Sequence, residues 1–281
     1  MKRILYLCIM VLLVLSCSRQ PENVTLVILS TTDTHSQVES LPKADSRYPD
    51  LGGYARRMGL VEAERKANPN VLLFDSGDFS QGTPYFNFFH GRVEIDAMNR
   101  MRYDAVTLGN HEFDNGLDTL AMLLRMAQFP IVCSNYDVTG TPLDGLVKPY
   151  VVIERGGARV GVLGLGVVDK DLISKKNFGG IRYLNPLECV NSVAATLRSE
   201  EHCDIVVCLS HLGSTGKGVQ GYENDRDTTL IPMVHSVDIF LSGHSHQLLN
   251  ERLDDADGKS LALVQSGKAG AYVGKSVVSL E

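Results

Sequence analysis

The stretch Thr107-Leu108-Gly109-Asn110-His111-Glu112-Phe113-Asp114 decides how the rest of the sequence is interpreted. It follows a β-prone run over residues 103–108 and precedes a helical pattern over 118–127, so residues 109–116 are expected to form a loop at a strand end. Functional groups concentrate on such loops. The amide oxygen of Asn110 can bind a cation, and Asp114 can hold the His111 imidazole. Taken alone, Asn-His is also explained by an Asx turn in which the histidine is simply hydrogen-bonded. The rest of the sequence is needed to choose between this turn and a metal site.

The composition indicates a compact globular protein. The chain has 281 residues, 44% of them hydrophobic, and a formal net charge of −6. Removal of residues 1–16, which include Lys2 and Arg3, would leave −6 − 2 = −8. Bulk charge of this sign argues against binding to nucleic acid or to an anionic membrane surface.

The N-terminus has the pattern of an export signal. Met1-Lys2-Arg3 precedes an apolar run from Ile4 to Leu15, which is too short to span about 30 Å of hydrocarbon. Val14-Leu15-Ser16-Cys17 resembles the lipobox of bacterial lipoproteins. We therefore expect a signal peptide over 1–16, lipidation of Cys17, a linker over 17–23, and a membrane-anchored protein on the periplasmic or cell-surface side. An ordinary secretory signal is the alternative.

The four later cysteines do not form a metal or disulfide motif. Cys133, Cys189, Cys203 and Cys208 lack C-x-x-C spacing, and their pairing stays open at this point. Cys208 lies in an apolar run, which predicts a core position.

Five apolar runs each deliver polar side chains of the metal-ligating type to their ends. The run 24–29 leads to Asp33 and His35, and the run 71–74 leads to Asp78. Asn110 follows the third run. His211 follows 204–209, and 237–241 leads to His244 and His246. Continuous apolar runs are typical of strands buried on both faces, so these residues should gather at one end of the fold.

The seven candidate ligands are enough for two cations that share Asp78. The candidates are Asp33, His35, Asp78, Asn110, His211, His244 and His246. Mixed nitrogen and oxygen ligands fit Zn, Mn, Fe or Co and discriminate poorly among them. His90, His202 and His235 have no such placement and are predicted to lie at the surface.

Helical patterns are predicted over 54–66, 92–101 and 186–199, and a hairpin is predicted about Gly156-Gly157. Arg56, Arg57, Arg65 and Lys66 are interpreted as the solvated face of the first helix. The aromatic run 85–89 is interpreted as packing rather than as a stacking platform.

The blocks D-x-H, G-D, G-N-H-E, H and G-H-x-H occur here in the order found in the calcineurin-like metallophosphoesterase superfamily, which the chain resembles over about 24–281. Within it, the segments 51–56, 77–84 and 104–114 look like signatures of the 5′-nucleotidase family. The resemblance implies a four-layer α/β/β/α sandwich with two mixed sheets.

The resemblance also implies roles for the candidate residues. Asp33, His35, Asp78 and His246 would hold one metal, and Asp78, Asn110, His211 and His244 the other. His111 and Asp114 would be the catalytic pair, with no cofactor besides metal. The implied reaction is dimetal-dependent hydrolysis of phosphate esters, most simply of nucleotides.

One part of the family pattern has no counterpart in this sequence. Complete 5′-nucleotidases carry a C-terminal domain that binds the nucleoside, whereas this sequence ends at Glu281, so we expect a separately encoded nucleoside-binding polypeptide. Two alternatives stay open: a phosphodiesterase or other ester hydrolase of the superfamily, and a non-catalytic accessory or binding subunit.

Overall fold

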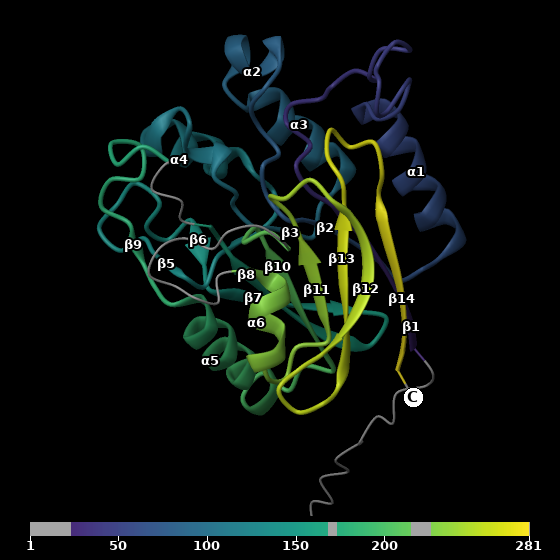
Figure 1. The fold of residues 1–281 in the computed structure, drawn as a ribbon, viewed down its shortest axis with the longest axis vertical. Helices are drawn as coiled ribbons and strands as arrows, with labels where there is room; N and C mark the ends of the chain where they lie inside the picture. Colours follow the sequence, from purple (N-terminus) through teal and green to yellow (C-terminus); the bar gives the residue numbers. More distant parts are fainter. Residues whose placement is uncertain (1–23, 168–172, 215–225, 281) are drawn as a thin grey trace, which may run out of the picture.

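The computed structural model describes residues 24–167, 173–214 and 226–280 (Figure 1). The predicted signal peptide, Cys17 and linker lie outside the described residues. Two six-stranded mixed sheets form the centre of the fold. The predicted α/β class with two mixed sheets is therefore confirmed.

The first sheet has the order β14-β1-β2-β3-β4-β6, and β14 is its one antiparallel strand. Its strands are β1 (Val24–Thr31), β2 (Val71–Asp75), β3 (Ala105–Val106), β4 (Ile131–Val132), β6 (Val147–Lys148) and β14 (Gly274–Leu280).

The second sheet has the order β12-β13-β11-β10-β8-β7, with β7 and β12 antiparallel at its two edges. Its strands are β7 (Tyr150–Arg155), β8 (Ala158–Leu165), β10 (Ile205–Ser210), β11 (Ile239–Ser242), β12 (Leu248–Asp254) and β13 (Ser260–Ser266). β5 (Tyr136–Asp137) and β9 (Arg182–Tyr183) form a separate small pair.

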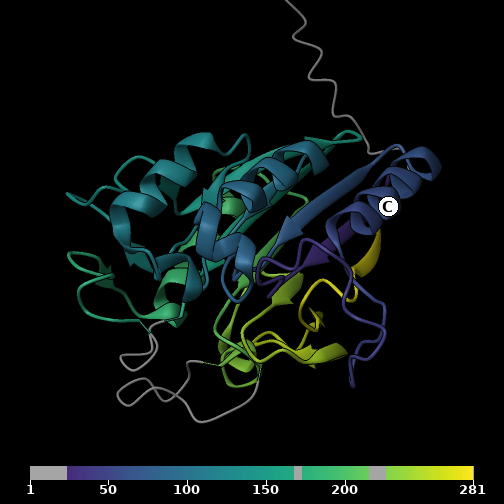
Figure 2. The same ribbon diagram turned by 90° about the horizontal axis from the view of Figure 1, so that it is seen from above.

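Helices cover the outer faces of the two sheets. On the first sheet lie α1 (Tyr54–Ala67), α3 (Arg92–Met101) and α4 (Gly116–Met126), which Figure 2 shows together on one side of the molecule. On the second sheet α5 (Pro186–Ser199) packs against β8 and β10. The shorter helices are α2 (Pro84–Phe89), η1 (His111–Phe113), α6 (Asp227–Leu230) and η2 (Ile231–Met233).

Alternation along the buried strands explains the four layers. In β1, Leu26 and Ile28 pack between the two sheets, whereas Val27 and Leu29 face the helices. In β10, Val207 and Leu209 point into the space between the sheets. Successive side chains of a strand point to opposite faces, so a continuous apolar run supplies two interfaces at once.

The predicted hairpin is confirmed. β7 and β8 pair in antiparallel register, from Arg155 opposite Ala158 to Tyr150 opposite Leu163. Gly156 and Gly157 between them have φ angles of 63° and 90°, which side-chain-bearing residues seldom adopt.

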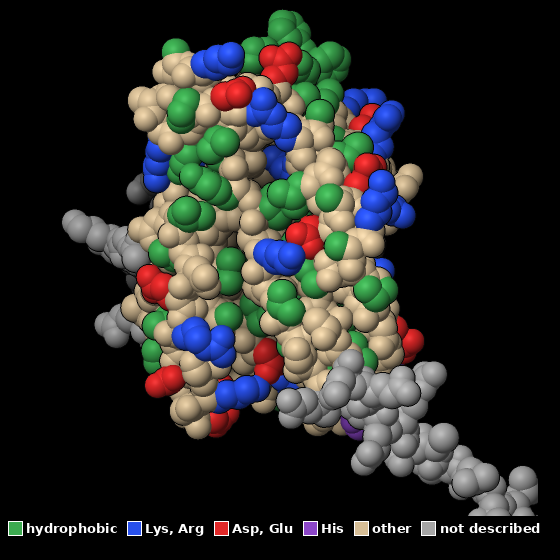
Figure 3. Space-filling view, turned by 90° about the vertical axis from the view of Figure 1, so that its right-hand side faces the viewer, with side chains coloured by type: hydrophobic (Ala, Val, Ile, Leu, Met, Phe, Trp, Pro, Cys, Tyr) green, Lys and Arg blue, Asp and Glu red, His purple; other side chains and the backbone are tan. Residues whose placement is uncertain are grey.

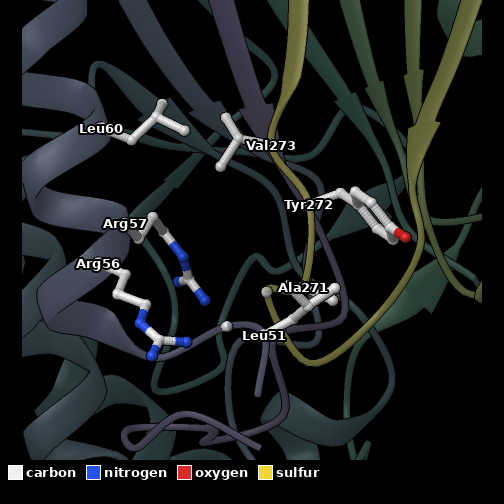
Figure 4. Close-up of a pocket in the computed structure, with 9 residues that line it drawn as sticks. Leu51, Arg56, Arg57, Leu60, Ala271, Tyr272 and Val273 are labelled. Atoms are coloured by element: carbon white, nitrogen blue, oxygen red, sulfur yellow. The ribbon is translucent and has the colours of Figure 1, made fainter. Parts of the chain in front are cut away.

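One arginine of α1 departs from the prediction of a solvated face. Arg57 is only 4% exposed, and its guanidinium carbon lies 4.9 Å from the centre of the Tyr54 ring. Its side chain points from α1 toward the segment that precedes β14 (Figure 4). A Cβ at Gly270 would lie 1.7 Å from Arg57 Nη2, so glycine at this position permits the close approach. The prediction is wrong for Arg57 and correct for the exposed Arg56.

The packing interpretation of residues 85–89 is wrong for Phe88 and Phe89, whereas Tyr85 and Phe86 are partly buried. These residues form most of α2, which has no buried side chain, and Phe88 and Phe89 are 77% and 48% exposed. Apolar side chains gather at the upper end of the face in Figure 3, where α2 lies in Figure 1. The short helix that begins at Pro84 exposes the rings of Phe88 and Phe89 to solvent.

The remaining sequence predictions concern cysteines, surface histidines and membrane spans. Cys208 is fully buried, as expected, and the four cysteines of the described residues are free thiols. His90, His202 and His235 are exposed, as predicted. Within the described ranges, no helix has the length and apolar character needed to cross a bilayer.

Candidate metal centre

The structure brings six of the seven predicted ligands into two adjacent groups. Asp33, His35 and His246 form one group, and Asp78, His211 and His244 form the other. Within each group, one nitrogen or oxygen atom per residue lies within 4.8 Å of the others. Each group contains residues from loops of both sheets, because His246 joins the loop of β1 and Asp78 joins the loops of β10 and β11.

In the first group, two imidazole rings face one carboxylate. His35 Nε2 and His246 Nε2 lie 2.9 Å apart, and Asp33 Oδ1 lies 3.9 Å and 3.3 Å from them. The Asp33 carboxylate accepts hydrogen bonds from Thr32 Oγ1 at 2.6 Å and from the backbone N–H of His244. These bonds fix the carboxylate between the rings.

In the second group, a buried histidine is oriented from behind. His211 Nδ1 donates to the carbonyl oxygen of Ser76 at 2.6 Å, which leaves Nε2 directed at Asp78 Oδ2, 3.1 Å away. Histidines that bind metals are typically fixed in this way by a hydrogen bond from the other ring nitrogen. Asp33 Oδ1 lies 4.0 Å from His211 Nε2, so the two groups adjoin.

Asn110 lies beside the second group. The backbone N–H of the next residue, His111, donates to Asp78 Oδ1 at 2.9 Å. Asn110 is 2% exposed, and its Oδ1 has no hydrogen-bond partner among the residues that the structure describes. A buried amide oxygen without a donor is costly unless a cation or water satisfies it.

His111 and Asp114 form the predicted pair at the edge of the site. His111 Nδ1 donates to Asp114 Oδ2 at 2.8 Å, and both side chains are about one third exposed. The His111 ring lies 5.5 Å from the His35 ring between centroids. The pair therefore borders the first group while remaining open to a substrate.

The two carboxylates dominate the electrostatics of the centre. Burial opposes a charged His211, but the carboxylates of Asp78 and Asp33 outweigh burial and raise its pKa to about 10. Burial likewise opposes an ionised Asp78, yet His211 and His35 hold the pKa of Asp78 well below its usual value. Burial lowers the pKa of His244 to about 4, with a contribution from His211.

The pKa of His111 depends on burial and on the neighbouring carboxylates, which act in opposite directions. Burial disfavours protonation of His111, but the hydrogen bond to Asp114 and the charge of Asp78 raise the pKa of His111 above its ordinary value. His111 can therefore carry a proton near neutral pH.

The residues present fit divalent cations. Two carboxylates and four imidazoles converge in the two groups. The buried, unpartnered Asn110 Oδ1 is a further acceptor that a cation would satisfy. The set is the mixed nitrogen and oxygen chemistry of Zn, Mn, Fe and Co sites.

Glu112 supports the centre and carries no role in the sequence prediction. Its Oε2 accepts the backbone N–H groups of Asp78 at 2.9 Å and Gly109 at 2.7 Å, and Oε1 accepts that of Ser80 at 3.3 Å. Burial, followed by the charge of Asp78, raises the pKa of Glu112 to about 8. Its position inside the G-N-H-E block is the one signal in the sequence that marks it.

Two further features of the site concern the backbone. Five ligand candidates have positive φ angles between 45° and 67°: Asp33, His35, Asp78, His244 and His246. Such conformations are strained in residues with side chains and concentrate at functional sites. A Cβ on Gly109 would lie 2.2 Å from Asp78 Oδ1, so only glycine fits there.

Comparison with known proteins agrees with this geometry. The model of the family described as calcineurin-like phosphoesterase matches residues 26–248. The chain is 32% identical to snake venom 5′-nucleotidase from Naja atra, over 89% of this chain and 49% of that protein. It is 31% identical to an apyrase from Tabanus yao, over 89% of this chain and 47% of that protein.

A solved structure with the same fold is that of a 5′-nucleotidase precursor from Thermus thermophilus. It superposes with a TM-score of 0.82 at 33% identity, over 92% of this chain and 52% of that one. The chain thus spans about half the length of the curated relatives it matches.

Proposed function

Since this chain belongs to the calcineurin-like phosphoesterase family, we propose that it hydrolyses phosphate monoesters, with nucleotides as the natural substrate class. The observation that carries the proposal is the pair of adjoining ligand groups bordered by the His111–Asp114 pair. The similarity to 5′-nucleotidases supports the choice of substrate.

The fold uses two divalent metals, and we propose a ligand set for each. Asp33, His35, Asp78 and His246 would hold one, and Asp78, Asn110, His211 and His244 the other. When bound, such cations supply Lewis acidity that activates water and neutralises charge developing on the phosphate. Asp78 lies with His211 and His244, and its other oxygen accepts the N–H of His111, which supports a central position.

The chain's own residues account for the proton chemistry. His111, whose pKa the hydrogen bond to Asp114 raises, would hydrogen-bond the phosphate and protonate the leaving oxygen. Burial of Asp33, Asp78 and His211 excludes water from the inner wall of the site and strengthens their interactions with charge.

The test is a hydrolysis panel on the purified chain. Mono- and diesters are offered with Zn, Mn, Fe and Co in turn, and bound metal is measured. The expected result is phosphate release from monoesters with two metals per chain. Activity confined to diesters would favour a phosphodiesterase, and no turnover with two metals bound would favour an accessory or binding role.

We further propose that nucleoside recognition needs a second folding unit, in this polypeptide or a separate one. The chain matches about half of each relative, and binding energy from remote parts of a substrate raises catalysis. The described fold alone should then show similar kcat/KM for a nucleoside monophosphate and an aryl phosphate. A kcat/KM of ~10⁶ M⁻¹s⁻¹ with clear base selectivity would contradict this proposal.

We also propose export and membrane anchoring through a lipid on Cys17, on the strength of Val14-Leu15-Ser16-Cys17. A lipoprotein anchor carries several acyl chains, which give stable attachment where one chain is marginal. Cys17→Ala should release the protein from membranes or leave it unprocessed. Fractionation of this variant with membranes as a processed protein would contradict the anchor.

A further inference from the structure

A buried carboxylate joins the ends of the two strands that carry histidine ligands. Asp227, the first residue of α6, is fully buried. Its Oδ1 accepts the hydroxyl of Ser210 at 2.5 Å, and its Oδ2 accepts the hydroxyl of Ser242. Its two hydrogen-bond donors are therefore serine hydroxyls next to the ligand loops, and neither serine is itself a candidate ligand.

The two serines occupy equivalent places. Ser210 and Ser242 are the last residues of β10 and β11 and stand opposite each other in the parallel register. Ser210 immediately precedes His211, and Ser242 precedes Gly243-His244. The Asp227 carboxylate therefore spans the two strands at the point where each turns into its ligand loop.

The backbone around His211 is held from both sides. Ser210 Oγ accepts the N–H of Leu212 at 3.2 Å, and the N–H of Asp227 donates to the carbonyl oxygen of Gly213 at 2.9 Å. The segment that contains His211 is therefore held on one side by Ser210, which bonds the Asp227 carboxylate, and on the other by the backbone N–H of Asp227.

Gln265 extends the same network beneath the second loop. It lies in β13, is 1% exposed, and its Nε2 is 2.9 Å from both Ser242 Oγ and the carbonyl oxygen of Gly243. Its Oε1 accepts Ser245 Oγ at 3.1 Å and the backbone N–H of Gln247. Gln265 thus contacts the loop before His244, between the two histidines, and after His246.

We propose that Asp227 and Gln265 are positioning residues of the metal centre, which fix the backbones of His211, His244 and His246 in the geometry that binds metal. This inference rests on the proposed dimetal function. His244 and His246 have φ angles of 67° and 54°, and strained conformations persist only where the surroundings over-determine them. The network supplies that constraint from three strands, and supporting shells of this kind typically contribute 10–100-fold to metal affinity.

Asp255 provides a matched control. It is a buried carboxylate in the turn between β12 and β13, and its Oδ1 accepts the backbone N–H groups of Asp257 and Lys259 at 2.9 Å and 2.8 Å. Both of these partners lie in the same turn, away from the loops that carry the candidate ligands. Asp255→Ala should therefore lower the free energy of unfolding without changing metal affinity.

In the experiment, metal-free protein is titrated with Co²⁺, and binding is monitored by the visible absorption of the bound ion. Competition with a chelator then gives the affinity. Wild type, Asp227→Ala, Asp227→Asn, Gln265→Ala and Asp255→Ala are compared, and urea unfolding is measured for each without metal. We expect Asp227→Ala and Gln265→Ala to weaken Co²⁺ binding about 10–100-fold. Asp227→Asn, which keeps the shape and one acceptor oxygen, should fold and show a smaller loss.

The outcomes separate this inference from the proposed function. Wild-type Co²⁺ affinity and an unchanged spectrum in Asp227→Asn and Gln265→Ala would overturn the positioning role even if both unfold more easily. Equal weakening in Asp255→Ala would also overturn it, because general destabilisation would then explain the effect. Wild-type protein that binds no Co²⁺ would refute the metal centre itself, and the inference with it.

Discussion

His35 Nε2 and His246 Nε2 lie 2.9 Å apart, although the two histidines come from loops of different sheets. Two ring nitrogens directed at each other and at the Asp33 carboxylate repel when both are protonated. Burial lowers the pKa of His35, which favours the neutral ring that a metal requires. The arrangement has the chemistry of a cation site rather than of an ion-pair network.

Asp78→Asn should lose most bound metal and all measurable activity. The carboxylate is 1% exposed, lies 3.1 Å from His211 Nε2, and would contribute charge to both cations. Metal content by elemental analysis and initial rates on an aryl phosphate check this. Asp96→Asn, on the exposed face of α3, is the control and should behave as wild type. Two metals per chain in Asp78→Asn would contradict the bridging assignment.

His111→Asn should retain both metals and the fold but lose about 10²–10⁴-fold in kcat, because it removes a proton donor and not a proposed ligand. Steady-state kinetics with metal analysis measure this. His90→Asn is a suitable control, since His90 is exposed with a φ of 53° that asparagine tolerates. Turnover at the wild-type rate in His111→Asn would rule out the catalytic role.

Glu112→Ala should destabilise the fold more than Glu112→Gln does. Alanine leaves the buried N–H groups of Asp78 and Gly109 without acceptors, at about 1–3 kcal/mol each. Glutamine resembles the protonated carboxyl that a pKa of about 8 implies, so it should preserve most of these bonds. Urea unfolding of both variants, with the exposed Glu62→Ala as control, measures the difference. Equal stability of the alanine and glutamine variants would argue against the acceptor role.

Asp75 should make stability fall as pH rises. Burial raises its pKa to about 7, against hydrogen bonds from Thr31 Oγ1 and the Gly77 N–H. In the unfolded chain the pKa is about 3.9, so between about pH 4 and pH 7 the folded state holds a proton that the unfolded state has released. The stabilisation that protonated Asp75 gives the folded state is fully present below about pH 4. It is lost as the pH rises to about 7, at up to about 1.4 kcal/mol per pH unit.

Asp75→Asn removes this titration and should flatten the dependence of the unfolding free energy on pH. Urea unfolding at several pH values, with chelator present for both proteins, isolates the difference. Identical slopes for Asp75→Asn and wild type would show that Asp75 is ionised in the folded state throughout.

Much of the fold could be predicted because its signals are local. The helix over 92–101 has its predicted ends, and α5 begins where Asn185 caps it and Pro186 occupies its first turn. The sequence also predicted that the candidate ligands would lie close together. Each of them follows an apolar run, and the carboxyl ends of parallel strands lie at the same edge of a sheet. β3 and β4 are shorter than the apolar runs that contain them. The length of a strand is set by its hydrogen bonds to the neighbouring strand, which the apolar pattern alone does not reveal.

The missed features depend on partners distant in the sequence. The helical pattern of α1 gives no sign that Arg57 turns inward, because the space it fills is created by Gly270. Asp227 and Gln265 stand outside every motif, and only the pairing of β10 and β11 reveals what they hold together. The positive φ angles of five candidate ligands are likewise a property of the assembled loops.

Each candidate ligand group takes residues from both sheets, so a metal bound there would link the stability of the folded protein to the supply of that metal. A cation held by Asp33, His35 and His246 would connect the loops of the two sheets, and dissociation of the ion would remove that connection. Ions that bind only the folded chain stabilise it by mass action, by about 2.7 kcal/mol at a hundred times the dissociation constant. The folded fraction of the protein would then follow the supply of free metal, and depletion of that metal would increase the unfolded population that proteases cleave.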